Sequence, residues 1–329
     1  MKTLEKYYDQ LRDWRAIQTA EAIDITLASN WFHENPEQRK SDLKTDFPLL
    51  FAPYPSLWME HAAPRQISFG SRVLRCTHQS ARCACLVIST SFDGDDQVSA
   101  LQNNVLHDAI YRMGSPFPFV LRRAATSFLS ALQHAIASGI QAHRGSIFIL
   151  FIDDDGLAPL SASYIYLDEI GNIVPSVNFP IIDPVATDKR MARMAKGMDW
   201  WPGMVGDHLA PFFFAIALMN AKNVSLVDAP LPPKVARRRE KDGKAALTFK
   251  TLHIEPMRAR VKQETKPGES ETKVAMHLCR GHFKDYRDGA GLFGKYKGLY
   301  WWESQVRGAE ENGRVIKDYE LGGPHGQVR

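Results

Sequence analysis

The sequence predicts an α+β protein built on a mostly antiparallel sheet, with flanking helices and a C-terminal part rich in β-hairpins. Short apolar runs of strand composition follow one another through short polar turns, so neighbouring strands are expected to pair antiparallel. No repeated alternation of strand and helix patterns is visible, which argues against a parallel sheet. A hydrophobic share of 44% with 24% charged residues is typical of a folded globular chain.

The first part of the chain predicts one helix, one irregular segment and one hairpin. Residues 1–19 carry apolar side chains at helical spacing, which predicts an amphipathic helix packed on the body, with a partner-binding helix as the alternative. Prolines with aromatics between them predict an irregular surface segment at 31–65. Residues 66–78 and 82–92 predict two strands joined by a short polar connection.

The middle of the chain predicts two helices followed by a meander of strands. Residues 100–112 and 122–138 have helical composition. Three apolar runs come next, separated by Asp-Asp-Asp-Gly and Asp-Glu-Ile-Gly-Asn. We expect them to form consecutive antiparallel strands with tight turns, at 146–152, 161–167 and 172–179.

Beyond the meander, helical and loop patterns alternate. The methionine-bearing segment 187–201 is expected to pack in the core, with a hydrophobic partner surface as the alternative. Residues 208–222 predict a helix buried on most faces. The basic, proline-containing segment 230–244 predicts an exposed loop, residues 247–256 a strand, and 261–273 a linker.

These patterns divide the chain into an α+β body, 1–232, and a β-rich basic part, 233–329, which would also fit as the completion of the same sheet in a single domain. The N-terminal residues lack a signal-peptide pattern, and the apolar run at 211–219 is too short to cross a bilayer. We therefore expect a cytoplasmic protein with reduced thiols and no membrane partner.

Candidate functional residues concentrate at 274–321, where imidazoles, basic side chains, aromatics and glycines occur together. Strands are predicted at 274–283 and 298–308. In the second strand, alternation places the odd-numbered residues from Trp301 to Arg307 on one face. In the first strand, His277 and His282 point to opposite faces unless Gly281 forms a bulge. If the polar faces of the two strands coincide, five residues converge: Arg280, His282, Glu303, Gln305 and Arg307.

Such a group suits a phosphodiester, because arginines neutralise phosphate charge and histidine moves protons near neutral pH. The candidate catalytic residues are His282, Arg280, Arg307, Glu303 and His277. The candidate nucleic-acid-binding residues are Lys295, Lys297, Trp301 and Gln305, with Tyr296 or Tyr300 as further rings for base stacking. The alternative is a structural hairpin whose arginines pair with Asp285, Asp288, Glu310 or Asp318.

The same stretch resembles a group of bacterial phage- and mobile-element-associated proteins to which no activity is attached. The matching residues are His277, Arg280, Gly281, His282, Phe283, Leu292, Phe293, Gly294, Gly298, Trp301, Trp302, Val306, Arg307, Gly308, Lys317, Asp318 and Tyr319. In that group the position of Gln305 is often a histidine, and glutamine cannot titrate. The glutamine at this position puts a two-histidine acid–base mechanism in doubt. The resemblance itself implies a mobile-element or phage-conflict setting.

A second constellation offers soft metal ligands. Cys76 and His78 share one face of their predicted strand, and Cys83 and Cys85 share one face of the next, so a hairpin would bring four zinc-type ligands together. The single-residue spacing differs from a zinc knuckle, and burial of small cysteines in the sheet explains Cys83 and Cys85 as well. We expect no cofactor, with zinc as the alternative.

Acidic loops offer a third constellation. Asp153, Asp154 and Asp155 follow an apolar run, where carboxylates can hold magnesium, and a second acidic loop lies at 93–96. An Asp-Gly sequence between two strands is, however, also the sequence of a hairpin turn, which we favour. Phosphate-loop, GxGxxG, HExxH and GxSxG patterns are absent from the sequence.

The sequence thus predicts a nucleic-acid-interacting protein of a mobile-element or phage-conflict system, of the toxin–antitoxin kind, that engages RNA or single-stranded DNA. Metal-independent RNA cleavage, with His282 or Glu303 as base, is an extension of this hypothesis. The alternative is a non-enzymatic protein with an interaction, structural or regulatory role, in which the C-terminal stretch contacts a protein partner.

Overall fold

A computed structural model describes residues 19–34, 47–62, 66–69, 72–75, 82–91, 144–153, 157–172, 179–181, 201–244, 248–257, 275–279, 281–303, 305–307 and 309–314. The chain forms two compact units, Met1–Ile254 (unit 1) and Glu255–Arg329 (unit 2). The helices predicted at 1–19, 100–112 and 122–138, the segment 187–201 and the linker 261–273 lie outside the described residues, except for residues 19 and 201.

Unit 1 is built on one eight-stranded sheet. Its strands lie in the order β8-β7-β6-β5-β2-β1-β10-β9, with five antiparallel neighbour pairs and two parallel ones, β2 with β1 and β1 with β10. The strands are β1 (Glu21–Asp24), β2 (Ser56–Ala62), β5 (Arg82–Ser91), β6 (Arg144–Asp153), β7 (Leu157–Leu167), β8 (Phe179–Ile181), β9 (Val224–Ala229) and β10 (Phe249–Ile254). The predicted α+β class with a mostly antiparallel sheet is confirmed.

The first two strands of the predicted meander are present as β6 and β7, which pair antiparallel, and β7 pairs antiparallel with β8. Of the third predicted strand, 172–179, only Phe179 belongs to β8, and residues 173–178 lie outside the described residues. Asp153 lies opposite Leu157, so residues 154–156 connect two neighbouring strands, as expected for a hairpin turn. Apolar runs of strand length, bounded by turn signals, made β6 and β7 predictable.

Two expectations for residues 31–92 are wrong. The segment 31–65 contains β2, whose residues are buried as far as His61. The hairpin expected between 66–78 and 82–92 does not form, since β3 (Gln66–Phe69) pairs with β4 (Arg72–Arg75) instead. Strand β5 is hydrogen-bonded to β2 on one side and to β6 on the other, and it is buried from Cys83 to Ile88.

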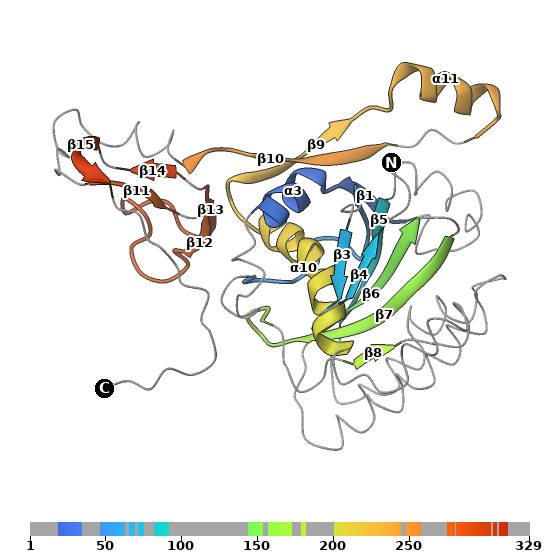
Figure 1. The fold of residues 1–329 in the computed structure, drawn as a ribbon, viewed down its shortest axis with the longest axis horizontal. Coiled ribbons are helices and arrows are strands. Elements are labelled where there is room, and N and C mark those ends of the chain that lie inside the picture. Colours follow the sequence, from blue (N-terminus) through green and yellow to red (C-terminus); the bar gives the residue numbers. More distant parts are fainter. Residues whose placement is uncertain are drawn as a thin grey trace. The chain divides into compact units, whose positions relative to one another are not determined.

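Helices α3 (Thr26–Glu34) and α10 (Trp201–Met219) lie on one face of the sheet (Figure 1). The predicted burial of α10 is confirmed, and the helix begins at Trp201, earlier than expected. Successive residues of a helix point about 100° apart, and three consecutive phenylalanines contact three different elements. Phe212 packs against His61 of β2, Phe213 against Phe148 of β6, and Phe214 stacks on Trp31 of α3.

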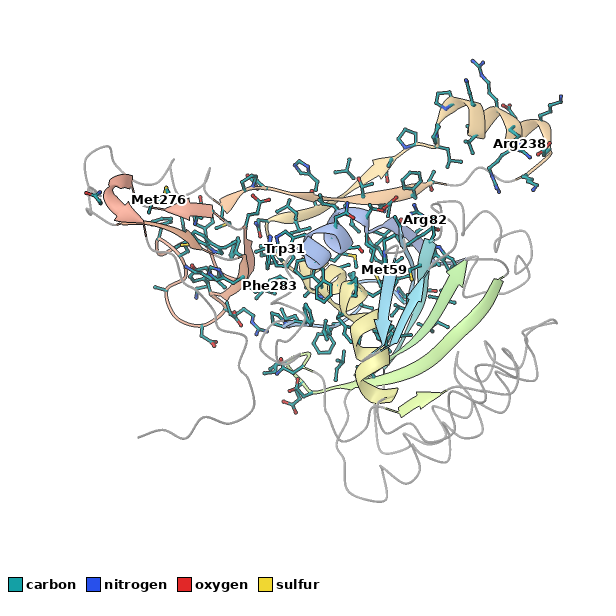
Figure 2. The ribbon with its side chains drawn as sticks, in the orientation of Figure 1. Trp31, Met59, Arg82, Arg238, Met276 and Phe283 are labelled. Carbon is teal, nitrogen blue, oxygen red and sulfur yellow. The ribbon has the colours of Figure 1, made fainter. Side chains whose placement is uncertain are left out.

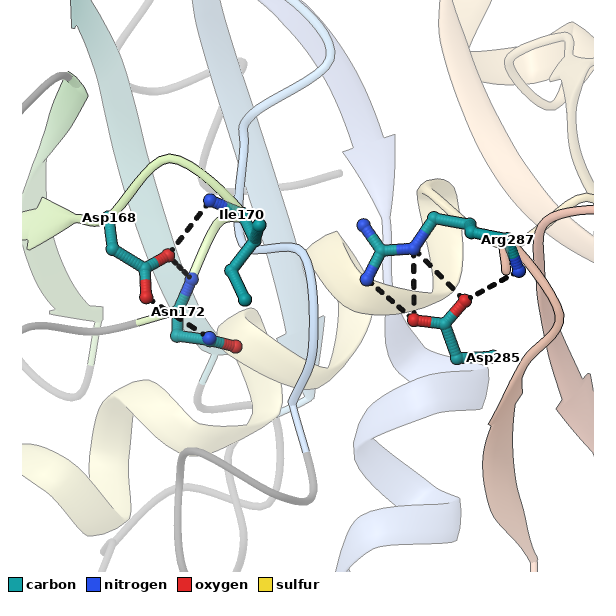
Figure 3. Close-up of polar contacts among 5 residues, drawn as sticks. All are labelled: Asp168, Ile170, Asn172, Asp285 and Arg287. Atoms are coloured by element: carbon teal, nitrogen blue, oxygen red, sulfur yellow. Dashed lines mark hydrogen bonds and ion pairs between the residues drawn. The ribbon is translucent and has the colours of Figure 1, made fainter. Parts of the chain in front are cut away.

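The turn after β7 is closed by Asp168 (Figure 3), and its Gly171 carbonyl oxygen accepts a hydrogen bond from Leu50 N–H of the segment 47–51. The Asp168 carboxylate accepts hydrogen bonds from the backbone N–H groups of Ile170, at 3.0 Å, and Asn172, at 2.8 Å. Gly171 has φ +85°, and a Cβ atom there would lie 2.9 Å from Leu49 Cα. The Asn220 side-chain amide, just after α10, donates to the carbonyl oxygens of Leu49 and Phe51. The turn predicted from Asp-Glu-Ile-Gly-Asn is confirmed.

The basic segment after β9 forms a helix, α11 (Pro233–Lys241), so the predicted exposed loop is wrong for these residues. The strand predicted at 247–256 is confirmed as β10, which pairs with both β1 and β9. Because β10 belongs to the large sheet, unit 1 extends to Ile254, whereas the sequence-based division fell at 232/233.

Unit 2 contains small sheets. Strand β11 (Ala275–Cys279) lies between β14 (Gln305–Arg307) and β15 (Ala309–Arg314), and β12 (His282–Asp285) pairs antiparallel with β13 (Leu299–Trp302). The β-hairpin-rich C-terminal part is confirmed. Among the described helices of both units, none is long and apolar enough to span a membrane.

Candidate nucleic-acid interface

The predicted C-terminal strands form one interrupted hairpin. His277 lies opposite Arg307 in the pairing of β11 with β14, and His282 lies opposite Trp302 in the pairing of β12 with β13. Between these two pairs one strand runs five residues, from 277 to 282, and the other also runs five, from 307 to 302. The register is therefore the same on both sides of the break between β11 and β12. Gly281 therefore does not shift the count as a bulge would.

This register separates the predicted polar residues. Residues directly opposite each other in an antiparallel pair share a face, so His282 shares a face with Trp302, whereas Phe283 shares the other with Trp301. Alternation assigns Glu303 and Gln305 to the face of Trp301. The expected convergence of His282 with Glu303, Gln305 and Arg307 is therefore wrong, because Trp302 rather than Trp301 is the cross-strand partner of His282.

The predicted binding residues differ in exposure. Lys295 and Lys297 are exposed, as are His282 and Glu303, and Gln305 is half-buried opposite Cys279. Arg280 lies outside the described residues, and only the backbone positions of His277 and Arg307 are described.

The aromatic rings chosen for base stacking are buried. Trp301 is 3% exposed and packs against Phe283 with ring centroids 4.8 Å apart, and Tyr300 is 4% exposed. A base cannot stack on a ring that the protein already covers. The prediction that Trp301 or Tyr300 stacks on bases is therefore wrong for this conformation.

A different aromatic side chain is exposed at the end of the hairpin. The tip loop (residues 286–298) is closed by a hydrogen bond from Tyr286 N–H to the Gly298 carbonyl oxygen. Within it, Phe293 and Gly294 are the central residues of a tight turn, and both have positive φ, +53° and +72°. Phe293 is 46% exposed. Such turns favour Asn, Asp or Gly, so a phenylalanine at this position is unusual and points to a role in function.

The tip loop folds back onto an apolar cluster, the hairpin core (Met257, Tyr286, Leu292, Tyr296, Tyr300 and Trp302). Leu292 and Tyr296 exchange backbone hydrogen bonds of 3.0 Å, and Gly291 has φ +79° where a Cβ atom would lie 2.8 Å from the Tyr296 carbonyl oxygen. Burial raises the pKa of the Tyr286 phenol, and a hydrogen bond with Trp302 opposes this rise. The loop that carries Phe293 is thus fixed by packing.

Lysines lie over the rings of the hairpin core. Lys284 Nζ lies 4.3 Å from the Trp302 ring centroid and Lys295 Nζ 5.2 Å from that of Tyr296. Lys297, two residues after Lys295, is exposed. Within the described part of the chain, neither Lys284 nor Lys297 forms an ion pair with a carboxylate. The ammonium groups of Lys284 and Lys297 therefore keep a positive charge that an anionic ligand can neutralise.

The arginine of the tip loop, Arg287, is paired with Asp285 at the end of β12 (Figure 3). Arg287 Nη2 lies 2.5 Å from Asp285 Oδ2, and the Arg287 backbone N–H also donates to this carboxylate. The hydrogen bond from the guanidinium lowers the pKa of Asp285, and the carboxylate in turn raises the pKa of Arg287. The structural alternative expected Arg280 or Arg307 to pair with a nearby carboxylate; Arg287 occupies Asp285, whereas Arg280 and the side chain of Arg307 lie outside the described part of the chain.

The candidate zinc ligands are not assembled by the expected hairpin. Cys83 and Cys85 are buried in β5, where their cross-strand neighbours are His61 and Met59 of β2 and Ile152 and Leu150 of β6. Cys76, His78 and the acidic loop at 93–96 lie outside the described residues. Among the residues that are described, no group of three or more histidine, cysteine or acidic side chains is placed to hold a metal ion.

Sequence reasoning missed one charged group in unit 1, the Arg82 cluster (Asp24, Glu60 and Arg82). Asp24 and Glu60 lie opposite each other on the parallel strands β1 and β2, and Arg82 forms ion pairs with both carboxylates. The Glu60 side chain is fully buried and also accepts a hydrogen bond from Trp58 Nε1 at 3.4 Å. These residues come from three strands that are distant in sequence, so no local pattern indicates them.

No protein-family model, curated protein or solved structure matches this chain. The functional argument therefore rests on the geometry described above.

Proposed function

We propose that the tip loop of unit 2 binds single-stranded nucleic acid, RNA or single-stranded DNA, in a mobile-element or phage-conflict system. The observation that carries the proposal is Phe293, an exposed aromatic ring held at positive φ in the same loop as the exposed Lys295 and Lys297. Exposed rings stack on unpaired bases of any sequence, and neighbouring cations contact the backbone. The cellular setting is supported only by the resemblance of residues 277–319.

The positive charges of the hairpin support this proposal. Lys284 and Lys295 lie over rings of the hairpin core, Lys297 is exposed, and His282 is exposed on the face that includes Trp302. Because Arg287 is paired with Asp285, the lysines supply the positive charge of the loop. A strand lying across the tip loop would place a base on Phe293 and phosphates near these lysines.

The proposal is for binding without cleavage. General acid–base chemistry needs both groups within hydrogen-bond reach of the reacting atoms of one bound substrate. His282 lies opposite Trp302, and alternation assigns Glu303 to the other face of the hairpin, so the two groups are not expected to reach one bond. Cleavage of RNA by the wild-type protein would contradict this part of the proposal.

The test is fluorescence anisotropy with labelled single-stranded RNA and DNA of 20 nucleotides, over a range of salt concentrations. Loss of base stacking in Phe293→Ala should weaken binding by about 1–3 kcal/mol. Ile170→Ala is the matched control, because Ile170 is a large apolar residue, 55% exposed, at a turn of unit 1. Equal affinities of the two variants would contradict the proposal, as would the absence of binding by folded wild-type protein at low salt.

The lysines are tested through the salt dependence. Removing two backbone contacts in Lys295→Gln/Lys297→Gln should reduce the slope of log K against log salt concentration by about 1.4 for a single strand. Lys222→Gln/Lys244→Gln removes the same charge from exposed positions of unit 1 and should leave the slope nearer to that of the wild type. Binding that does not depend on salt would instead favour a protein partner.

A further inference from the structure

Helix α11 is a defined basic helix rather than a solvated loop. Pro233 is its first residue, where proline is well tolerated. At the other end Gly243, with φ +64°, donates its N–H to the Glu240 carbonyl oxygen, and Lys244 N–H donates to that of Arg239. These two hydrogen bonds form a Schellman motif, which fixes the end of the helix.

The helix carries its exposed cations on one face. At about 100° per residue, four basic residues fall within an arc of about 100°, and all are exposed: Lys234, Arg237, Arg238 and Lys241. Val235 and Arg239 occupy another face, where Val235 is half-buried and Arg239 is 5% exposed. We name the four exposed residues the α11 stripe.

The carboxylates of the helix leave most of this charge in place. Arg238 lies 3.9 Å from Asp242, but the two side chains are 85% and 45% exposed, so the pair is weak. Within the part of the chain that the structure describes, Lys234, Arg237 and Lys241 form no ion pair. Figures 1 and 2 show that α11, with Arg238 labelled, lies beyond the ends of β9 and β10 to which it is connected. Its stripe is therefore accessible.

We propose that the α11 stripe is a second nucleic-acid contact, which binds the phosphodiester backbone independently of the tip loop. Lys234 and Lys241 are separated by a rise of about 10 Å along the helix axis, a length over which one strand of a duplex presents about three phosphates. Each arginine guanidinium can bind two oxygens of one phosphate at once. An anionic membrane surface is disfavoured, because helices that lie on membranes need a broad apolar face, and α11 offers only Val235 and Ala236.

The test compares variants that remove equal charge from different places. Arg237→Gln/Arg238→Gln keeps residues of good helix propensity, and Lys222→Gln/Lys244→Gln is the matched control. Binding of a labelled 16-base-pair duplex and of a 20-nucleotide single strand is followed by anisotropy against salt. For the duplex, loss of two contacts should reduce the slope of log K against log salt concentration by about 1.8. Arg237→Lys/Arg238→Lys should retain most of the slope.

The same comparison in a Phe293→Ala/Lys295→Gln/Lys297→Gln background separates this inference from the tip-loop proposal. If the tip loop does not bind nucleic acid, the stripe variant still loses salt-dependent binding in that background. An unchanged slope in Arg237→Gln/Arg238→Gln, with far-UV circular dichroism showing an intact fold, would overturn the inference. Binding of wild-type protein to phosphatidylserine vesicles but not to either nucleic acid would overturn it as well.

Discussion

The large sheet of unit 1 and the tip loop of unit 2 use the same kinds of residue in opposite ways. In unit 1 the Arg82 guanidinium is paired with Glu60 and Asp24, and Lys250 Nζ bonds Glu21 at 3.0 Å between β10 and β1. The hydrogen bond to Glu21 raises the pKa of Lys250. In the hairpin that carries the tip loop, Lys284 lies over the Trp302 ring instead. Carboxylate partners make a cation part of the architecture, whereas rings leave its charge available to a ligand.

The glycines and aromatics follow the same division. Gly171 is enclosed by Leu49 and Phe51, whereas Gly294 has no neighbour within 4 Å of the position of a Cβ atom. The phenylalanines of α10 are buried, whereas Phe293 is exposed. The comparison teaches that residue type alone does not mark a site, and that enclosure decides between a structural role and a binding role. Four experiments test it.

The largest effect is expected from the buried charge. Arg82→Met leaves the fully buried Glu60 carboxylate without its main partner, which should lower the free energy of unfolding by about 3–5 kcal/mol. Arg238→Met, at a side chain that is 85% exposed, should change it by less than about 0.5 kcal/mol. Urea denaturation measures both. The double variant Glu60→Gln/Arg82→Met should regain part of the stability lost in Arg82→Met. Equal stability of Arg82→Met and Arg238→Met would show that the Arg82 cluster does not stabilise the sheet.

The two glycines provide the next comparison. Gly171→Ala combines a positive φ with a Cβ atom 2.9 Å from Leu49 Cα, so we expect a loss of more than about 2 kcal/mol. Gly294→Ala has the positive φ without the close contact and should lose about 1 kcal/mol. Thermal unfolding followed by circular dichroism ranks the two. A larger loss at Gly294 would show that the tip loop is the more enclosed of the two turns.

A smaller effect is expected at the ring-bound lysine. Lys284→Met removes the cation that lies 4.3 Å from the Trp302 ring and should lower stability by about 0.5–1 kcal/mol. Lys297→Met, at an exposed lysine, should be closer to neutral. Both changes are measured by urea denaturation at low and at high salt. A loss at Lys297 equal to that at Lys284 would contradict the ring contact as the cause.

The smallest effect is a pH dependence at Asp285. Because the hydrogen bond from Arg287 lowers the folded-state pKa of Asp285, this carboxylate stabilises unit 2 above the ordinary aspartate pKa of about 3.9. That contribution is lost as the pH falls through the lowered value. Carbon-13 NMR titration should show the Asp285 midpoint rising in Arg287→Gln. An unchanged midpoint would mean that the pair in Figure 3 does not form in solution.

Local patterns predicted the parts of the fold whose signals are long. Strands β6 and β7 carry apolar runs bounded by turn signals, and the second half of α10 is densely apolar, so these elements were evident. Strand β1 has four residues and pairs with segments far along the chain, which no window of sequence contains. Helix α11 was interpreted as a loop from its charge, although Pro233 and Gly243 mark its two ends.

The candidate site was predictable in place but not in detail. The basic and aromatic composition of 274–321 located the hairpin. Its register was not predictable, because β13 has aromatic residues on both faces, Tyr300 and Trp302 on one and Trp301 on the other. Alternation alone therefore gave no means of deciding which ring is covered. The exposure of Phe293 depends on the fold of the whole tip loop.

The position of β1 in the sheet has a consequence for protein synthesis. β1 pairs with β2 on one side and, on the other, with β10, where Ile23 lies opposite Lys250. As the chain leaves the ribosome, β1 must wait for more than two hundred further residues before its second neighbour exists. Such distant pairing slows folding, and an open strand edge invites pairing with other chains. The nascent protein is therefore most prone to aggregate before β10 emerges, when a chaperone that shields strand edges would help it most.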